Sequence, residues 1–278
     1  MDASTRTVDL PQFGMQFEIL SSDSIIGPAI AKGSWADHET QLFRAHVEPG
    51  CTVVDLGANI GWFSAQAILA GATVHAFEPV PAIADVCERN MRRAEAVGKG
   101  RGVLHRAAAG AEPGTAEIAV AAENFGDNRV LDDGAERPAD MAGTENITIE
   151  IARVDDHVEA PVRFMKIDTQ GSEWLALSGA TKTIDASPEL ALLLEFWPYA
   201  LRGAEPEQVI EFLSSRGFTL GKATEAPYPM SPERILRQVG GRGDVRGGID
   251  LYGTRGRPFH VLGAASRLRG WLRGIKED

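Results

Sequence analysis

The sequence predicts an α/β fold: a Rossmann-like, doubly wound sheet of about seven strands, mostly parallel with an antiparallel edge strand. Continuous apolar runs such as CTVVDLG (51–57), typical of strands covered on both faces, alternate with segments of helical periodicity. A glycine turn, DLGANIG, follows the first run, and the next apolar run ends on Glu78. This order of strand, turn, helix and acid-ended strand is typical of sheets that bind a nucleotide.

Before the sheet, we expect a short hairpin and a helix packed on the core. Residues 13–32 alternate loosely between apolar and polar and contain turn residues, which favours a hairpin. A helix is predicted from about Asp37, ending at Pro49 and Gly50.

The sheet itself is predicted from strands and helices that alternate along the chain. In order they are strand 51–57, helix 61–71, strand 73–79, helix 82–97, strand 102–110, an insertion or hairpin over 111–158, strand 162–168, helix 172–184, strand 190–196, helix 206–217, and an antiparallel edge pair formed by 218–223 and 249–256. Between the last two strands, the glycine-rich residues 240–248 are expected to form a mobile loop.

The domain organisation follows from these elements. We expect an N-terminal hairpin and helix, one large nucleotide-binding α/β domain and a C-terminal basic amphipathic helix or tail, at 1–50, 51–258 and 259–278. For the tail, we expect docking on the domain rather than on a membrane surface.

Composition narrows the functional classes. The formal net charge is −11 and the pI is near 5.1, which argues against a general nucleic-acid binder. The two cysteines, Cys51 and Cys87, lie in apolar patterns and are expected to be buried free thiols. We find no secretory signal and no apolar stretch of about 18 residues, so a cytoplasmic protein is predicted.

Two kinds of ligand compete for the glycine turn. A dinucleotide site requires G-x-G-x-x-G, but Asn59 and Trp62 occupy the second and third glycine positions when Gly57 is the first. A smaller anion, such as the carboxylate of S-adenosylmethionine, does not require those glycines. Glu78 follows Gly57 by 21 residues, and a carboxylate there can accept hydrogen bonds from both ribose hydroxyls of an adenosine.

Five segments carry a resemblance to a known family: VVDLGANIGWFS (53–64), HAFEPVP (75–81), HRAAAG (105–110), FMKIDTQGSEWLALSGA (164–180) and LLLEFWP (192–198). Over roughly residues 39–220, the chain resembles the FkbM-type S-adenosylmethionine-dependent methyltransferases. The resemblance implies a Rossmann-like sheet ending in an antiparallel strand, and methyl transfer, commonly to a hydroxyl of a sugar or natural product.

The resemblance also implies a cofactor site. By matched position, Asp55, Gly57, Asn59 and Gly61 would line the methionine and sulfonium side, Glu78 would hold the ribose, Ala107 and Ala108 would lie near the adenine, and Glu39 would lie near the methionine end.

For the chemistry, the strand-end carboxylates Asp168 and Glu195 are the catalytic candidates, expected side by side at the carboxyl ends of adjacent strands. They could share a divalent cation, or one could stay ionised as a base while the other is neutralised. We expect Lys166 to lie too deep in its strand to donate to them. We favour the metal-free arrangement, with Asp168 as the base.

Other polar and aromatic residues keep two interpretations. Glu173 favours a helix N-terminus, and His75 and His105 favour ordinary sheet positions. His157 is a weak candidate for a base. Asp127 and Arg129 either contact the ligand or form a plain turn. Trp197 and Tyr199 either stack on a sugar ring or pack at a strand end.

The predicted function is S-adenosylmethionine-dependent methyl transfer to a hydroxyl of a sugar or natural-product small molecule. The alternatives are a small-molecule N-methyltransferase and a non-catalytic nucleotide-binding partner subunit. The expected partner is a small-molecule acceptor, with no nucleic acid and no membrane surface, and the sequence indicates no oligomeric state.

Overall fold

The central layer of the fold is a seven-stranded sheet. The computed structural model describes residues 4–121, 124–131, 145–240 and 247–259. Along the sheet, the strands are ordered β12 (Thr219–Lys222), β13 (Ile249–Arg255), β11 (Leu190–Phe196), β10 (Phe164–Ile167), β3 (Thr52–Leu56), β4 (Thr73–Phe77) and β5 (Arg101–His105). Neighbours are parallel except at β13, which runs antiparallel to β11 and β12. The expected antiparallel pair is therefore present, with β13 one place in from the edge.

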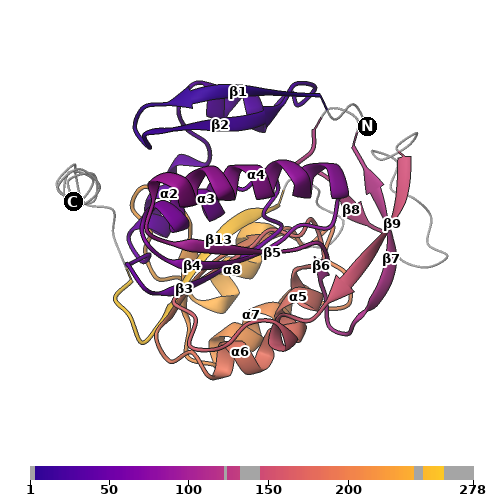
Figure 1. The fold of residues 1–278 in the computed structure, drawn as a ribbon. Coiled ribbons are helices and arrows are strands. Elements are labelled where there is room, and N and C mark those ends of the chain that lie inside the picture. Colours follow the sequence, from indigo (N-terminus) through magenta and orange to yellow (C-terminus); the bar gives the residue numbers. More distant parts are fainter. Residues whose placement is uncertain (1–3, 122–123, 132–144, 241–246, 260–278) are drawn as a thin grey trace.

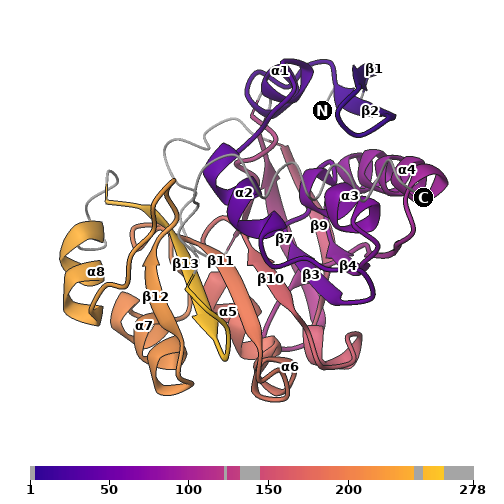
Figure 2. The ribbon, with the colours of Figure 1, turned by 90° about the vertical axis from the view of Figure 1, so that its left-hand side faces the viewer.

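Helices cover both faces of this sheet, which confirms the doubly wound class (Figures 1 and 2). One face carries α2 (Asp37–Arg44), α3 (Trp62–Leu69) and α4 (Pro81–Val97), and the other carries α5 (Glu173–Gly179), α6 (Thr181–Asp185), α7 (Pro206–Ser215) and α8 (Pro232–Val239). Two apolar clusters, one on each face, hold these layers together.

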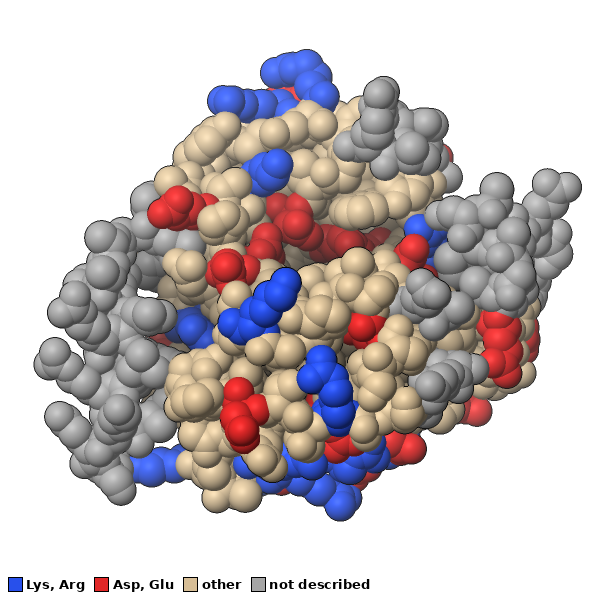
Figure 3. Space-filling view, turned by 90° about the horizontal axis from the view of Figure 1, so that it is seen from above, with Lys and Arg blue, Asp and Glu red and all other residues tan. Residues whose placement is uncertain are grey.

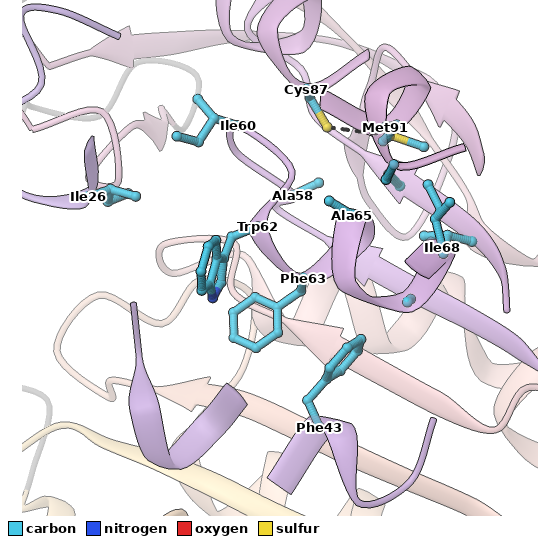
Figure 4. Packing of buried hydrophobic residues seen from close by; sticks show 14 of the residues in the cluster. Ile26, Phe43, Ala58, Ile60, Trp62, Phe63, Ala65, Ile68, Cys87 and Met91 are labelled. Carbon is cyan, nitrogen blue, oxygen red and sulfur yellow. Dashed lines mark hydrogen bonds between the residues drawn. The ribbon is translucent and has the colours of Figure 1, made fainter. Parts of the chain in front are cut away.

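Helix α3 is buried along its whole length, because it lies between the sheet and the N-terminal elements. Trp62 and Phe63 point away from it toward other elements (Figure 4). The Phe63 ring packs edge-on against Phe43 of α2 at 5.3 Å, and Trp62 packs edge-on against Phe13 and Phe17 at 5.5 and 5.8 Å. The large side chain at position 62 thus joins the glycine turn to the N-terminal segment.

The N-terminal hairpin lies earlier in the chain than expected. Its strands are β1 (Thr5–Leu10) and β2 (Met15–Leu20), and residues Ile26–Ala31 form helix α1 instead of the second half of a hairpin. The expected span of 13–32 was wrong because Gly14, with φ 66°, forms the hairpin's turn rather than its start.

Glu18 of β2 attaches this hairpin to helix α4. Its carboxylate accepts hydrogen bonds from Arg89 at 2.8–3.1 Å and from Arg93 at 3.0 Å. The Asn90 side chain pairs with both backbone groups of Glu18, at 2.7 and 2.8 Å. The hydrogen bonds from Arg89, followed by one from the Thr5 side chain and by the charges of both arginines, lower the pKa of Glu18 from 4.5 to about 2 against the raising effect of burial.

The insertion after β5 builds a second sheet beside the first. It is ordered β6 (Ala108–Ala109), β9 (Glu145–Ala152), β7 (Gly114–Val120) and β8 (Arg129–Val130). The expected strand 102–110 is therefore divided, because β5 ends at His105 and the chain then turns to pair with β9. A short 3-10 turn, Val154–Asp156, leads back toward β10.

The helices also differ from expectation in three places. Helix α2 ends at Arg44, five residues before Pro49, and the expected helix 172–184 breaks between α5 and α6. Helix α8 was not expected, although Ser231 caps it by accepting a hydrogen bond from the Arg234 N–H at 3.3 Å. The expected C-terminal helix and the centre of the glycine-rich loop, 260–278 and 241–246, lie outside the described residues.

Candidate active site

A cavity of about 440 Å³ opens at the carboxyl ends of β3, β4, β10 and β11. In parallel sheets this edge is where ligands bind, and the volume suits a nucleoside-sized molecule. Its wall includes the predicted residues Gly57, Asn59, Glu78, Asp168 and Glu195.

The glycine turn is shaped by close contacts that exclude side chains. A Cβ on Gly57, which has φ 74°, would lie 1.8 Å from the Asp168 carbonyl oxygen, so no other residue fits. Gly61, with φ 85°, precedes α3, and a Cβ there would lie 3.1 Å from Cys87 Sγ. Gly57 therefore lines the cavity, whereas Gly61 supports the turn from behind.

Glu78 is held at the cavity wall by two backbone donors. Its carboxylate accepts hydrogen bonds from the Asn59 N–H and the Val80 N–H, each at 3.0 Å. The side-chain amide of Asn59 donates to the Phe125 carbonyl at 2.8 Å, which ties the glycine turn to the insertion. Burial raises the pKa of Glu78 to about 7, against the smaller lowering effect of the two backbone donors.

Asp55 lies beneath the turn rather than in the cavity wall. One of its oxygens accepts a hydrogen bond from Ser64 Oγ at 2.6 Å, and the other, Oδ1, has no hydrogen-bond partner within the described part of the chain. Burial raises the pKa of Asp55, while the Lys166 charge opposes that rise. Asp55 therefore supports the site through Ser64 and Lys166.

The two alanines expected near the adenine are separated by the structure. Ala108 lines the cavity, and Ala107, although buried, is not among the lining residues. Position 108 belongs to β6 of the second sheet, so this sheet contributes one side of the cavity.

Asp168 and Glu195 are joined through a glutamine. Gln170 Nε2 donates to Asp168 Oδ1 at 2.8 Å and to Glu195 Oε2 at 2.6 Å. The other oxygen of Asp168 pairs with Lys166 Nζ at 2.9 Å. The expectation that Lys166 lies too deep was wrong, because its long side chain spans the two-residue repeat of the strand and reaches Asp168.

The surroundings of Asp168 and Glu195 shift the pKa values of the two groups differently. Burial would raise the pKa of Asp168, but the Lys166 charge and the hydrogen bonds from Lys166 and Gln170 hold it below its usual value. Burial and the Asp168 charge raise the pKa of Glu195 well above its usual value. The pKa values of the two groups are thus shifted in opposite directions, which favours ionisation of Asp168 over ionisation of Glu195 and disfavours two like charges buried together.

A smaller cavity of about 310 Å³ adjoins the first and shares Lys166, Asp168 and Glu195 with it. It also contains Glu39, the candidate for the methionine end, and Asp250. Asp250 lies directly opposite Glu195 in the β11–β13 register, so both side chains are on one face. Burial, followed by the Glu39 and Asp168 charges, raises the pKa of Asp250 to about 6.

Figure 3 shows a hollow in the molecular surface with acidic atoms gathered inside it. Sequence reasoning missed three members of this environment: Gln170, Asp250 and the donor role of Lys166. The motif KIDTQGSE contained Lys166 and Gln170, but their contacts depend on side-chain direction. Asp250 carried a weaker signal than Glu195, because it lies at the start of its apolar strand and Glu195 near the end of one.

Of the remaining candidates, four line the larger cavity. Asp127 and Arg129 form an ion pair at 2.8 Å, and the rings of Trp197 and Tyr199 lie 5.5 Å apart. Glu173 instead shapes the turn before α5, because one of its oxygens accepts from the Thr169 N–H, the Thr169 hydroxyl and the Gly171 N–H at 2.9–3.2 Å.

The histidines stand apart from this cavity. His75 and His105 are hydrogen-bonded to one another at 3.1 Å, and the exposed His157 ring lies 4.9 Å from His105. None of the three lines the larger cavity. In the described ranges, no group of three or more His, Cys, Asp or Glu residues is arranged to hold a metal ion. Among the same residues, no helix is long and apolar enough to cross a membrane.

Comparison with solved structures returns methyltransferases. The methyltransferase FkbM of Methylobacillus flagellatus KT is 21% identical, with a TM-score of 0.44, and the match covers 73% of this chain and 43% of that one. A putative rRNA methylase from Clostridium thermocellum is 12% identical, with a TM-score of 0.45, over 79% of this chain and 94% of that one. The magnesium protoporphyrin IX methyltransferase of Synechocystis PCC 6803, with bound SAM, is 13% identical, with a TM-score of 0.42, over 84% of this chain and 84% of that one.

The present chain thus spans less than half the length of the Methylobacillus protein. No curated protein matches the sequence. The family model described as the methyltransferase FkbM domain matches residues 55–220, which is more than half of the 278 residues. This match runs from the end of β3 to the start of β12 and includes both Glu78 and the Asp168–Glu195 pair, so the chain belongs to the FkbM methyltransferase family.

Proposed function

We propose that the protein is an S-adenosylmethionine-dependent methyltransferase that transfers a methyl group to a hydroxyl of a sugar or natural-product small molecule. One observation carries the proposal. The buried carboxylate of Glu78, beside the glycine turn, shares a single cavity with the Asp168–Glu195 pair. This arrangement supports a nucleoside-binding role for Glu78 and a proton-accepting role for Asp168.

The residues present fit this cofactor. Both oxygens of Glu78 accept one backbone N–H each, and a carboxylate oxygen retains a further lone pair for a ribose hydroxyl. At Gly57 the backbone is exposed to the cavity, because no side chain can stand there. Ala108 and Phe77 supply apolar wall. When bound, S-adenosylmethionine would supply a methyl group on a positively charged sulfur.

The carboxylate pair supplies the proton chemistry. Lys166 keeps Asp168 ionised, so Asp168 can accept the acceptor's hydroxyl proton as the oxygen gains the methyl group. The bound cofactor would supply the methyl group to the acceptor oxygen and leave as the neutral thioether S-adenosylhomocysteine, and Asp168 would afterwards release the accepted proton to solvent. Positioning by the cavity walls brings the reacting atoms into line.

Two alternatives remain for the experiments to decide. An amine acceptor would make the protein an N-methyltransferase that uses the same residues. A non-catalytic nucleotide-binding subunit would have no need of two linked carboxyl groups in the same cavity as Glu78, and the Asp168–Glu195 pair is what favours an enzyme. Asn59 and Trp62 occupy the positions where a dinucleotide site requires glycine.

Calorimetry with S-adenosylmethionine, S-adenosylhomocysteine and NAD tests the cofactor. We expect the first two to bind and NAD to show no heat, and binding of NAD alone would overturn the proposal. Incubation with a methyl-labelled cofactor and a panel of sugars, glycosides and amines, followed by mass spectrometry, identifies the acceptor. A label found on nitrogen alone would replace O-methylation by N-methylation, and no label on any acceptor class would favour the partner subunit.

A further inference from the structure

The turn between β10 and α5 is held in an unusual backbone conformation. Within the described ranges, the non-glycine residues with positive φ are Ala36, Asn59 and Gln170. Asn59 and Gln170 line the larger cavity, and Ala36 lines the smaller one. Positive φ is unfavourable for a residue with a side chain, and such positions cluster at functional sites.

At Gln170 the neighbouring residues are fixed on both sides. The Glu173 carboxylate accepts hydrogen bonds from Thr169 and from the Gly171 N–H. Gly171 packs so closely that a Cβ on it would lie 2.2 Å from the Ala200 carbonyl oxygen. Residue 170 therefore has little freedom, and its side chain is directed at Asp168 and Glu195.

The chemistry of an amide suits this place. Its nitrogen carries two N–H donors and accepts nothing, so it can donate one hydrogen to each carboxyl group. A carbonyl oxygen in the same place would face two groups rich in lone pairs. A glutamate there would bring a third carboxyl group beside Asp168 and Glu195, where Lys166 is already paired with Asp168.

We propose that Gln170 is a positioning residue: its amide holds the Asp168 and Glu195 carboxyl groups side by side, with Asp168 oriented to receive the acceptor's proton. The proposal rests on the proposed methyltransferase function. It assigns Gln170 no contact with the reacting atoms, since it acts through the two carboxyl groups.

Four variants separate the amide from the backbone strain. Gln170→Met keeps the length of the side chain and removes both donors, and Gln170→Glu replaces the amide by a carboxylate. Gln170→Gly removes the amide but relieves the positive φ, so it should unfold at a higher temperature than the wild type. Gln238→Met, at an exposed position of α8, is the matched control.

The first measurement needs no acceptor. Carboxyl ¹³C signals are followed by NMR as a function of pH, with Asp168 and Glu195 assigned through Asp168→Asn and Glu195→Gln. We expect the midpoint of the Asp168 titration to move to higher pH in Gln170→Met and Gln170→Gly, because a hydrogen-bond donor to the ionised carboxylate is lost. In Gln170→Glu the midpoint should move further still. Gln238→Met should match the wild type. An unchanged Asp168 midpoint in Gln170→Met would overturn the proposal.

The second measurement uses the acceptor found with the labelled cofactor. We expect kcat to fall about 10²-fold in Gln170→Met and Gln170→Gly, with KM little changed, as for misplaced catalytic groups. Wild-type kcat in the more stable Gln170→Gly would show that the amide does not position the pair. If the wild type transfers no methyl group at all, the proposed function fails, and the NMR titration still decides whether Gln170 holds the pair.

Discussion

Glu18 and Glu78 are both almost fully buried, at 6% and 5% exposed, yet their pKa values are shifted in opposite directions. Glu18, between the hairpin and α4, meets two arginines, and its pKa is lowered to about 2. Glu78, at the cavity wall, accepts hydrogen bonds from two backbone N–H groups, and burial raises its pKa to about 7.

The difference shows how a buried carboxylate can be assigned to structure or to function. A carboxylate whose charge is neutralised inside the protein stabilises the fold. One whose pKa is raised chiefly by burial, as those of Glu78, Glu195 and Asp250 are, is a candidate for binding a ligand or a proton. Substitutions in the two regions should therefore give separable effects, on stability in one and on binding or rate in the other.

The largest effect is expected at Asp168. Asp168→Asn should lower the rate of methyl transfer by about 10²–10⁴-fold, the range for loss of a general base, while the protein stays folded. Activity should survive a metal chelator. Asp156→Asn, an exposed change of the same chemistry, is the control. Full activity in Asp168→Asn would remove Asp168 from the mechanism, and restoration by Mg²⁺ of activity lost to a chelator would disprove the metal-free base.

Glu78→Gln should come next, with cofactor affinity as the measured quantity. Loss of hydrogen bonds to a charged acceptor costs about 1.5–3 kcal/mol, which corresponds to about a ten- to hundredfold rise in Kd by calorimetry. In the wild type, affinity should increase as pH rises through about 7, because the ionised carboxylate is the better acceptor.

In Glu78→Gln this pH dependence should disappear. Glu211→Gln, on the exposed side of α7, should behave as the wild type. The same Kd in wild type and folded Glu78→Gln would place the ribose elsewhere.

Glu18→Gln should affect stability and leave cofactor affinity unchanged. We expect a loss of about 1–3 kcal/mol in the free energy of unfolding at pH 7, because charge-assisted hydrogen bonds are replaced by neutral ones. Glu18 titrates at about 2 in the folded state and 4.5 when unfolded, so its contribution is present above pH 4.5 and is lost as pH falls toward 2. Denaturant unfolding over this range should show a shallower acid dependence in the variant, and identical profiles would contradict the comparison.

The smallest effect is expected at an exposed ion pair on α4, the helix to which Glu18 attaches the hairpin. Arg92 pairs with Glu88 one turn away, with side chains 71% and 35% exposed. Arg92→Ala should change the free energy of unfolding by about 0.5 kcal/mol or less. A loss as large as that of Glu18→Gln would mean that exposure does not distinguish the two pairs.

Local sequence patterns were sufficient for the sheet, the glycine turn and Glu78, because strand periodicity and turn geometry depend on nearby residues. The side-chain contacts inside the site could not be predicted in this way. Lys166 reaches Asp168 through rotamers of a long side chain, and Gln170 turns inward because its turn has a positive φ. Asp250 meets Glu195 through a strand register set 55 residues away along the chain.

The place of β13 in the sheet has a consequence for the order in which the protein is made. The glycine turn and Glu78 leave the ribosome in the first third of the chain, whereas Asp250 enters only with the last described strand. Because β13 lies between β11 and β12, it must insert into the sheet rather than add to its border. During synthesis, the part of the site around the glycine turn and Glu78 can thus form well before the part around Glu195 and Asp250, which is completed when β13 pairs with β11.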